Sequence, residues 1–166
     1  ACVVVGVFES RKLTPSADLI DSASQSLLSD LLRRGDMDGK AGSTLLLHNV
    51  PGTVCDRVLL VGLGKEKEFR DKAYCTAIRN TLKALRDTGA QNATIFLTEI
   101  PVAKRNTGWR IRQAAMLSLD SAYRFDQFKS KKNENHSKLR KLAFAVEQRS
   151  ELALADIEAR AEEILK

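Results

Sequence analysis

The stretch VLLVGLGKEKEF, Val58 to Phe69, decides the fold, because it joins a run of branched apolar residues to a glycine turn and then to a helical pattern. A buried strand that delivers such a turn into a helix is typical of α/β proteins. Many of these proteins hold a phosphate at the turn, so the first hypothesis to test is a nucleotide-binding loop.

The turn fits neither of the common nucleotide motifs. A P-loop needs GxxxxGK followed by Ser or Thr, but Leu59 stands where the first glycine belongs and Glu66 where the hydroxyl belongs. A dinucleotide fingerprint needs a third glycine where Lys67 stands. Glu66 and Glu68 would also repel a phosphate. The sequence therefore favours a structural strand-to-helix turn.

Working outward, apolar runs and amphipathic patterns alternate along the chain. The runs predict strands at residues 1–8, 44–50, 57–63, 93–100, 123–128 and 141–146. The three- and four-residue spacing of apolar residues predicts helices at 14–35, 69–88, 107–122 and 152–165. Strands alternating with helices predict a three-layer α/β/α sandwich. The turn signal Pro51-Gly52 makes 44–50 and 57–63 hairpin neighbours, so we expect a mixed sheet.

The ends of the first predicted helix carry clear signals. Thr14 is the expected N-cap, Pro15 suits the first helical position and Gly35 fits a left-handed stop. Thr107 is the expected cap of the third helix. Three acidic residues lie off the apolar stripe of the first helix and are expected on a solvated face: Asp18, Asp21 and Asp30.

Length and composition bound the class of protein. The chain has 166 residues, 43% of them hydrophobic and 29% charged, which indicates one globular domain able to bury its own core. Its apolar runs are too short to span a membrane. Cys2, Cys55 and Cys75 are isolated and show no metal-ligand spacing. Free thiols without a secretory leader favour the cytoplasm.

Most of the net charge sits in one segment. Residues 129–141 (KSKKNENHSKLRK) hold six basic residues and one acid, a charge of +5 out of the chain's +6. The candidate nucleic-acid-binding residues are Lys129, Lys131, Lys132, Lys138, Arg140 and Lys141, and the patch could extend to Lys104, Arg105, Arg110 and Arg112. Such a patch would bind DNA with an affinity that falls as the salt concentration rises. The alternative is that the segment is a solvated loop with no binding function. No aromatic residues interleave with the lysines to stack on bases.

No catalytic or metal constellation is found. His48 and His136 are the only histidines, and neither has a carboxylate at ligand spacing or a GxSxG serine nearby. A structural role is expected for His48 and a solvated one for His136. We therefore assign no catalytic residue and no metal ligand.

An ordered set of segments nevertheless resembles a known family. VVVGVFESRKLTPSA, LLRRGDMDGKAGSTLLLHNVPG, DRVLLVGLGKEKEF, IRNTLKALRDTGA, IFLTEIPVAKRNTGWRIRQA and YRFDQFKSKK are similar to the N-terminal domain of bacterial leucyl aminopeptidases, the cytosol aminopeptidases of metallopeptidase family M17. The resemblance covers the chain to about Ser150. It implies a macro-domain-like sandwich at 1–150, followed at 151–166 by the start of a helix that links to a C-terminal peptidase domain.

The resemblance also implies what the parent protein does. In the family, the peptidase domain binds two divalent metal ions, zinc or manganese, and cleaves the N-terminal residue, commonly leucine, from peptides. The ligand stretches resembling "GKGLTFDSGG" and "NTDAEGR" do not occur in this chain. We therefore expect an inactive fragment that opens and stops inside a longer chain, whose partners are its own peptidase domain and a homo-hexamer.

Two alternatives remain open. Some bacterial members of the family also bind DNA, which adds interest to the basic segment. The macro-domain-like fold, together with Gly62 and Gly64, leaves an ADP-ribose or nucleotide binder as the second alternative.

Overall fold

The computed structural model describes residues 1–128 and 139–145, and the backbone alone for 124–128. Within these ranges a five-stranded sheet has the order β2-β3-β1-β4-β5. Its strands are β1 (Cys2–Val7), β2 (Thr44–His48), β3 (Arg57–Gly62), β4 (Asn92–Ile95) and β5 (Lys141–Phe144). All neighbouring strands are parallel except β2, which runs antiparallel to β3. The mixed sheet is as predicted.

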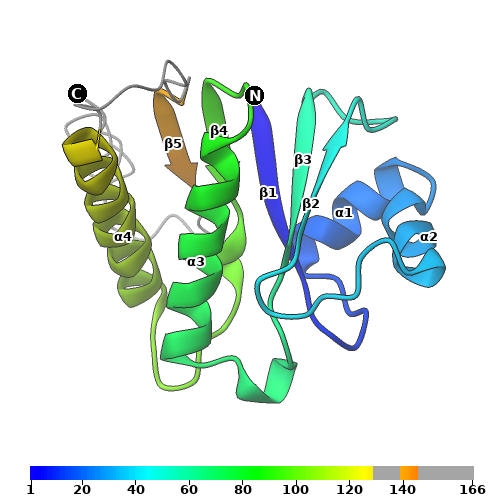
Figure 1. Cartoon of the computed structure of the whole chain (residues 1–166). Coiled ribbons are helices and arrows are strands. Elements are labelled where there is room, and N and C mark those ends of the chain that lie inside the picture. The colour runs from blue at the N-terminus through cyan, green and yellow to red at the C-terminus, as the bar shows by residue number, and fades with distance from the viewer. Residues whose placement is uncertain (129–138, 146–166) are drawn as a thin grey trace.

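Helices cover both faces of the sheet, which completes the predicted three-layer sandwich (Figure 1). One face carries α1 (Pro15–Ala23) and α2 (Leu27–Arg34), and the other carries α3 (Asp71–Arg86) and α4 (Thr107–Phe128). Two short 3-10 turns, η1 (Glu66–Glu68) and η2 (Leu97–Glu99), precede α3 and α4.

The two central strands β1 and β3 are unbroken apolar runs in the sequence, because both faces of each strand are buried. Val4 and Leu59 point into the core under α3 and α4, whereas Val5 and Leu60 point into the core under α1 and α2. All four side chains are at most 2% exposed. The central strands therefore anchor both layers of helices.

The hairpin β2–β3 forms as the Pro51-Gly52 signal predicts. Leu45 lies opposite Leu60 in the antiparallel register. The connection turns on Asn49 and Gly52, whose φ angles of 51° and 75° lie in the left-handed region. Asn and Gly are the residues that adopt this conformation at least cost.

The first predicted helix is in fact two helices. Gln25 and Ser26 have φ angles of 58° and 66°, which end α1 and redirect the chain into α2. Ser24 assists the break, since its hydroxyl donates to the carbonyl of Ile20 at 2.7 Å. The apolar stripe resumes in α2 with the same spacing, so periodicity alone did not reveal the break.

Asp21 is a second correction, because it is buried rather than solvated. Its side-chain carboxylate accepts hydrogen bonds from the backbone N–H of Ser29 at 2.9 Å and from the Ser29 hydroxyl at 2.5 Å. Ser29 is the third residue of α2, so Asp21 satisfies one of the amides that a helix leaves free at its start. The carboxylate thereby holds α1 and α2 together.

The start of α1 is also held from a distance. Thr14 occupies the N-cap position, but its side chain makes no cap hydrogen bond. The Glu99 carboxylate accepts from the backbone N–H and the hydroxyl of Ser16 instead, at 2.9 and 2.7 Å. A contact across 83 residues therefore replaces the predicted local cap.

Two strand predictions were wrong in extent or kind. Residues 123–128 were expected to form an edge strand, but they continue α4, since no Pro or Gly stops a long helix there. The strand predicted at 93–100 ends at Ile95, and η2 follows. Residues 129–138 of the basic segment and the helix predicted at 152–165 lie outside the described residues.

Candidate functional site

The glycine turn is part of the scaffold, because its backbone amides are already hydrogen-bonded within the protein. The N–H groups of Gly62, Leu63 and Gly64 donate to the carbonyls of Ser43, Val7 and Gly39 at 2.8, 2.9 and 2.9 Å. A phosphate site needs such amides free to point at the ligand. The turn therefore gives no support to the nucleotide or ADP-ribose alternative.

Gly62 is required at this turn for a steric reason. A side chain at this position would overlap the carbonyl oxygen of Lys40 and the hydroxyl of Ser43, which pack directly against it. Close approach of two backbones thus explains a glycine that resembles a nucleotide motif.

Two of the six candidate nucleic-acid-binding residues are within the described residues. Arg140 and Lys141 are exposed at the start of β5, where both backbone N–H groups donate to the carbonyl of Gln91, at 2.7 and 3.1 Å. Lys129, Lys131, Lys132 and Lys138 lie outside the described residues.

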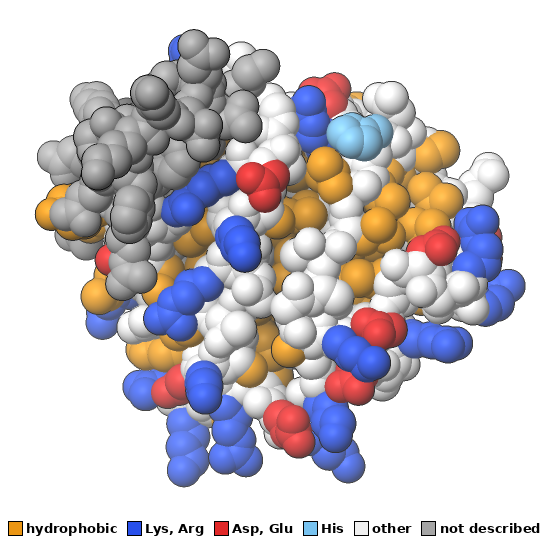
Figure 2. Space-filling model, viewed as in Figure 1, with side chains coloured by type: hydrophobic (Ala, Val, Ile, Leu, Met, Phe, Trp, Pro, Cys, Tyr) orange, Lys and Arg blue, Asp and Glu red, His pale blue; other side chains and the backbone are white. Residues whose placement is uncertain are grey.

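Among the described residues, the proposed extension does not lie next to Arg140 and Lys141. Lys141 pairs with Asn92 at the beginning of β4, whereas Lys104, Arg105 and Arg112 follow the end of that strand. Figure 2 shows that Lys and Arg side chains on the face of α3 and α4 are interspersed with Asp and Glu. The described basic residues therefore do not gather into one patch there.

Arg110 is buried and structural, which corrects its assignment to the patch. Its guanidinium donates to the Thr98 carbonyl and to the Thr107 hydroxyl, both at 2.9 Å, and only 7% of the residue is exposed. The Tyr74 hydroxyl donates to the Arg110 carbonyl at 2.7 Å, which ties α3 to α4. Burial raises the pKa of Tyr74 well above its usual range.

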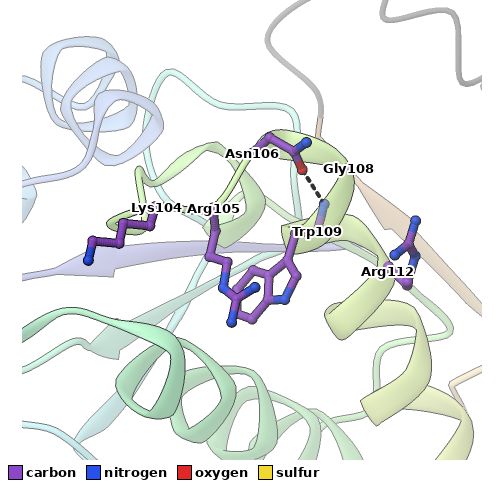
Figure 3. A pocket seen from close by; sticks show the side chains of 6 residues that line it. All are labelled: Lys104, Arg105, Asn106, Gly108, Trp109 and Arg112. Carbon is purple, nitrogen blue, oxygen red and sulfur yellow. Dashed lines mark hydrogen bonds between the residues drawn. The ribbon is translucent and has the colours of Figure 1, made fainter.

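A surface hollow of about 370 Å³ lies at the start of α4, around Trp109 (Figure 3). It is lined by Lys104, Arg105, Asn106, Gly108, Trp109 and Arg112. The Asn106 side chain accepts from the backbone N–H of Trp109 at 2.8 Å. Asn106, and not the predicted Thr107, thus caps the helix and fixes its first turn.

The Trp109 ring is held between α3 and the loop before α4. The Arg105 guanidinium lies 4.8 Å from the ring centroid, and Tyr74 packs at 5.7 Å between ring centroids. Arg105 is itself held by Asp71, with a shortest N–O distance of 2.7 Å. This hydrogen-bonded ion pair lowers the pKa of Asp71 and raises that of Arg105. Trp109 therefore presents a fixed, half-buried aromatic surface.

The other cations of the hollow point apart. In Figure 3, Lys104 and Arg112 extend in different directions from the loop and the helix, with Trp109 between them. Neither side chain forms a hydrogen bond or ion pair with any other described residue. The two cations of the hollow therefore do not converge on one point. Sequence reasoning missed Trp109, although it is the chain's only tryptophan.

A second, smaller hollow of about 250 Å³ lies between α3 and the loop before β2. Lys72, Thr76 and Asn80 line one side at helical spacing, and Gly42 and Gly62 line the other.

No catalytic or metal centre is found in the part of the chain that the structure describes. Within it, no group of three or more His, Cys, Asp or Glu side chains is arranged to hold a metal ion. His48, expected to be structural, is exposed on the edge strand β2. Cys2 is buried, and burial raises its pKa to about 11, so it is an unreactive thiol at neutral pH. No helix among the described residues could cross a bilayer.

The sheet order and the two helical layers define a class of α/β/α domain that macrodomains share. The macrodomain of Mycobacterium tuberculosis DarG matches with a TM-score of 0.55 at 8% identity, over 87% of this chain and 88% of that one. A tomato leucine aminopeptidase matches with a TM-score of 0.66 at 19% identity, over 98% of this chain and 32% of that one. At such identities the likeness establishes the fold.

The sequence narrows this class to one family. The domain described as "Cytosol aminopeptidase family, N-terminal domain" matches residues 4–132. The "Probable cytosol aminopeptidase" of Dechloromonas aromatica (strain RCB) is 64% identical over 156 residues, which cover 94% of this chain and 31% of that protein. The chain therefore belongs to the cytosol aminopeptidase family, as its N-terminal domain, and the resemblance is confirmed. It spans about a third of that relative's length.

Proposed function

We propose that this chain is the non-catalytic N-terminal domain of a cytoplasmic leucyl aminopeptidase. The parent protein would remove N-terminal residues, preferably leucine, from peptides. The observation that carries this proposal is the 64% identity to a protein named as a cytosol aminopeptidase, over nearly the whole of this chain.

The chemistry of the parent is proposed to reside outside this chain. The family is metal-dependent, and two divalent ions, zinc or manganese, would activate a water for attack on the scissile peptide bond. No residue described above is assigned to those metals. The fragment itself is therefore expected to be inactive.

The role of the domain is then structural and regulatory. We assign residues 1–150 to the sandwich domain and 151–166 to the start of a helix that leads to the peptidase domain. The parent is proposed to assemble as a homo-hexamer. The matched relative extends well beyond the region of similarity, which supports a further domain.

The test is hydrolysis of leucine p-nitroanilide, with manganese or zinc added, by this chain and by the longer protein that contains it. We expect activity in the longer protein alone. Hydrolysis by this chain that co-purifies with it through two chromatographic steps would overturn the proposal, as would inactivity of the longer protein toward aminoacyl anilides.

A second candidate function is DNA binding through the basic segment. The observation that favours it is the charge of +5 within residues 129–141, of which Arg140 and Lys141 are exposed. Cations that neutralise phosphates release counterions, so the affinity would fall steeply with salt.

Fluorescence anisotropy of a labelled duplex, measured across about 50 to 200 mM salt, tests this second candidate. The variant to compare has Lys129, Lys131, Lys132 and Lys138 changed to Ala. A matched control removes the same charge by changing four exposed lysines outside the segment to Ala: Lys40, Lys65, Lys67 and Lys83. Binding that the control keeps and the first variant loses supports the candidate. No binding at the lowest salt concentration refutes it.

A further inference from the structure

One row of side chains on α4 is exposed, except for the half-buried Trp109 at its start, and has the spacing of an interface. Trp109, Arg112, Met116 and Leu119 follow one another at intervals of three, four and three residues, which places them on one side of the helix. Met116 is 57% exposed and Leu119 is 49% exposed. Single exposed apolar residues are ordinary, but a row of Trp, Arg, Met and Leu has the composition of a buried contact. We refer to these four residues as the α4 stripe.

The chain leaves the sheet next to the beginning of this stripe. The Ala145 carbonyl accepts from the Thr98 hydroxyl at 2.5 Å, and the Thr98 carbonyl accepts from the Arg110 guanidinium at 2.9 Å. Residue 145 therefore lies beside the first turn of α4. Only residues 146–150 separate it from the helical pattern at 151–166, so that segment can reach the stripe without a long connection.

The sequence of 151–166 matches the stripe in spacing and length. Leu154, Ile157, Ala161 and Ile164 repeat the intervals of three, four and three residues. Ten residues separate the first and last members of each row, which corresponds to about 15 Å along a helix. Two helices whose contact rows have equal length and spacing can pack side by side.

Charge favours the same pairing. Residues 151–166 contain five acidic and two basic side chains, a net charge of −3. Arg112 within the α4 stripe and Lys104 next to it are exposed and pair with no acidic residue among those described. An acidic amphipathic segment therefore complements the α4 stripe, which contains Arg112 and lies next to Lys104.

We propose that residues 151–166 dock as a helix along α4, with Leu154, Ile157, Ala161 and Ile164 covering Met116 and Leu119. The hollow beside Trp109 receives the start of the segment. This contact would fix the direction in which the chain leaves the domain. It involves only residues of this chain, so its failure would leave the proposed aminopeptidase role untouched.

Hydrogen exchange measured by mass spectrometry on the 166-residue chain tests the docking. We expect amides of 151–166 to exchange at least about tenfold more slowly than in a synthetic peptide of the same sequence. Leu119→Lys should return them toward the peptide rate. The matched control is Leu19→Lys, at a residue of α1 that is 72% exposed, and it should leave the protection unchanged.

Trp109 provides an independent readout, because it is the only tryptophan and lies within the stripe. Ile157→Lys, on the covering segment, should shift its emission to longer wavelength and increase its quenching by acrylamide. Three results would overturn the proposal. They are peptide-like exchange of 151–166 in the wild type, protection that survives Leu119→Lys, and protection that grows with protein concentration, which would assign the stripe to a second copy.

Discussion

Replacing Asp21 by Ala should destabilise the domain more than any other single change to an acidic side chain of α1. The carboxylate is 8% exposed and accepts two hydrogen bonds from Ser29, one from the third amide of α2 and one from the hydroxyl. Loss of a capping acceptor costs about 1 kcal/mol. A second hydrogen bond to a charged group adds about 1.5 kcal/mol.

The expected loss of unfolding free energy for Asp21→Ala is therefore about 2–3 kcal/mol, which lowers Tm by roughly 5–10 °C for a domain of this size. Asp21→Asn keeps one acceptor oxygen for the Ser29 amide and should lose about 1 kcal/mol. Urea unfolding followed by Trp109 emission gives the free energy directly, and the slope with urea should not change.

Asp18→Ala is the matched control, because Asp18 lies on the same helix but is exposed. It should lose less than about 1 kcal/mol, the value of a carboxylate near a helix N-terminus. If Asp21→Ala lost no more than Asp18→Ala, the carboxylate would not be what joins the two helices.

Three further outcomes are expected. Tyr74→Phe removes the hydroxyl that donates to the Arg110 carbonyl, and it should lower the unfolding free energy measured in urea by about 1–2 kcal/mol. An unchanged free energy would mean that the packing of α3 on α4 does not depend on this hydrogen bond. Gly62→Ala should lower the unfolding free energy by at least about 2 kcal/mol, because the new methyl group meets the Lys40 carbonyl. Gly35→Ala, at an exposed position, should lower it by less. Equal losses in urea unfolding would contradict the argument from close backbone approach at Gly62. Burial raises the pKa of the Cys2 thiol from 9.0 to about 11. The protonated thiol therefore contributes its full stabilisation below pH 9, and this contribution is lost as pH rises through about 11. In urea unfolding across this pH range, Cys2→Ala should lose less unfolding free energy than the wild type.

The sequence was sufficient for the features that depend on local patterns. β1 and β3 are unbroken apolar runs because both faces of a central strand are buried, and Pro51-Gly52 marked the hairpin. The glycine turn was correctly interpreted as structural, since its spacing failed both nucleotide motifs and its amides are bonded to the backbone.

The features that were missed depend on contacts between distant segments. The break after α1 leaves the spacing of the apolar residues unchanged, and Ser24 and Ser26 on either side of Gln25 were the one local sign of it. The sequence predicted Arg110 as a surface cation, whereas in the structure its buried guanidinium donates to the Thr98 carbonyl of η2. The hollow around Trp109 exists because Asp71, on another helix, positions Arg105 over the ring, and no local motif encodes that arrangement.

The position of β1 in the sheet also governs the order in which the domain can fold. Val4 pairs with Leu59 on one side and with Ile95 on the other, so the strand that is synthesised before the other four described strands becomes the central one. Among the described strands, its first partner is complete only after more than fifty further residues have been synthesised, and its second partner follows later still. Long-range pairing of this kind slows folding and leaves an apolar strand unpaired in the nascent chain. A chaperone that binds exposed apolar segments would therefore find a target in β1 during synthesis.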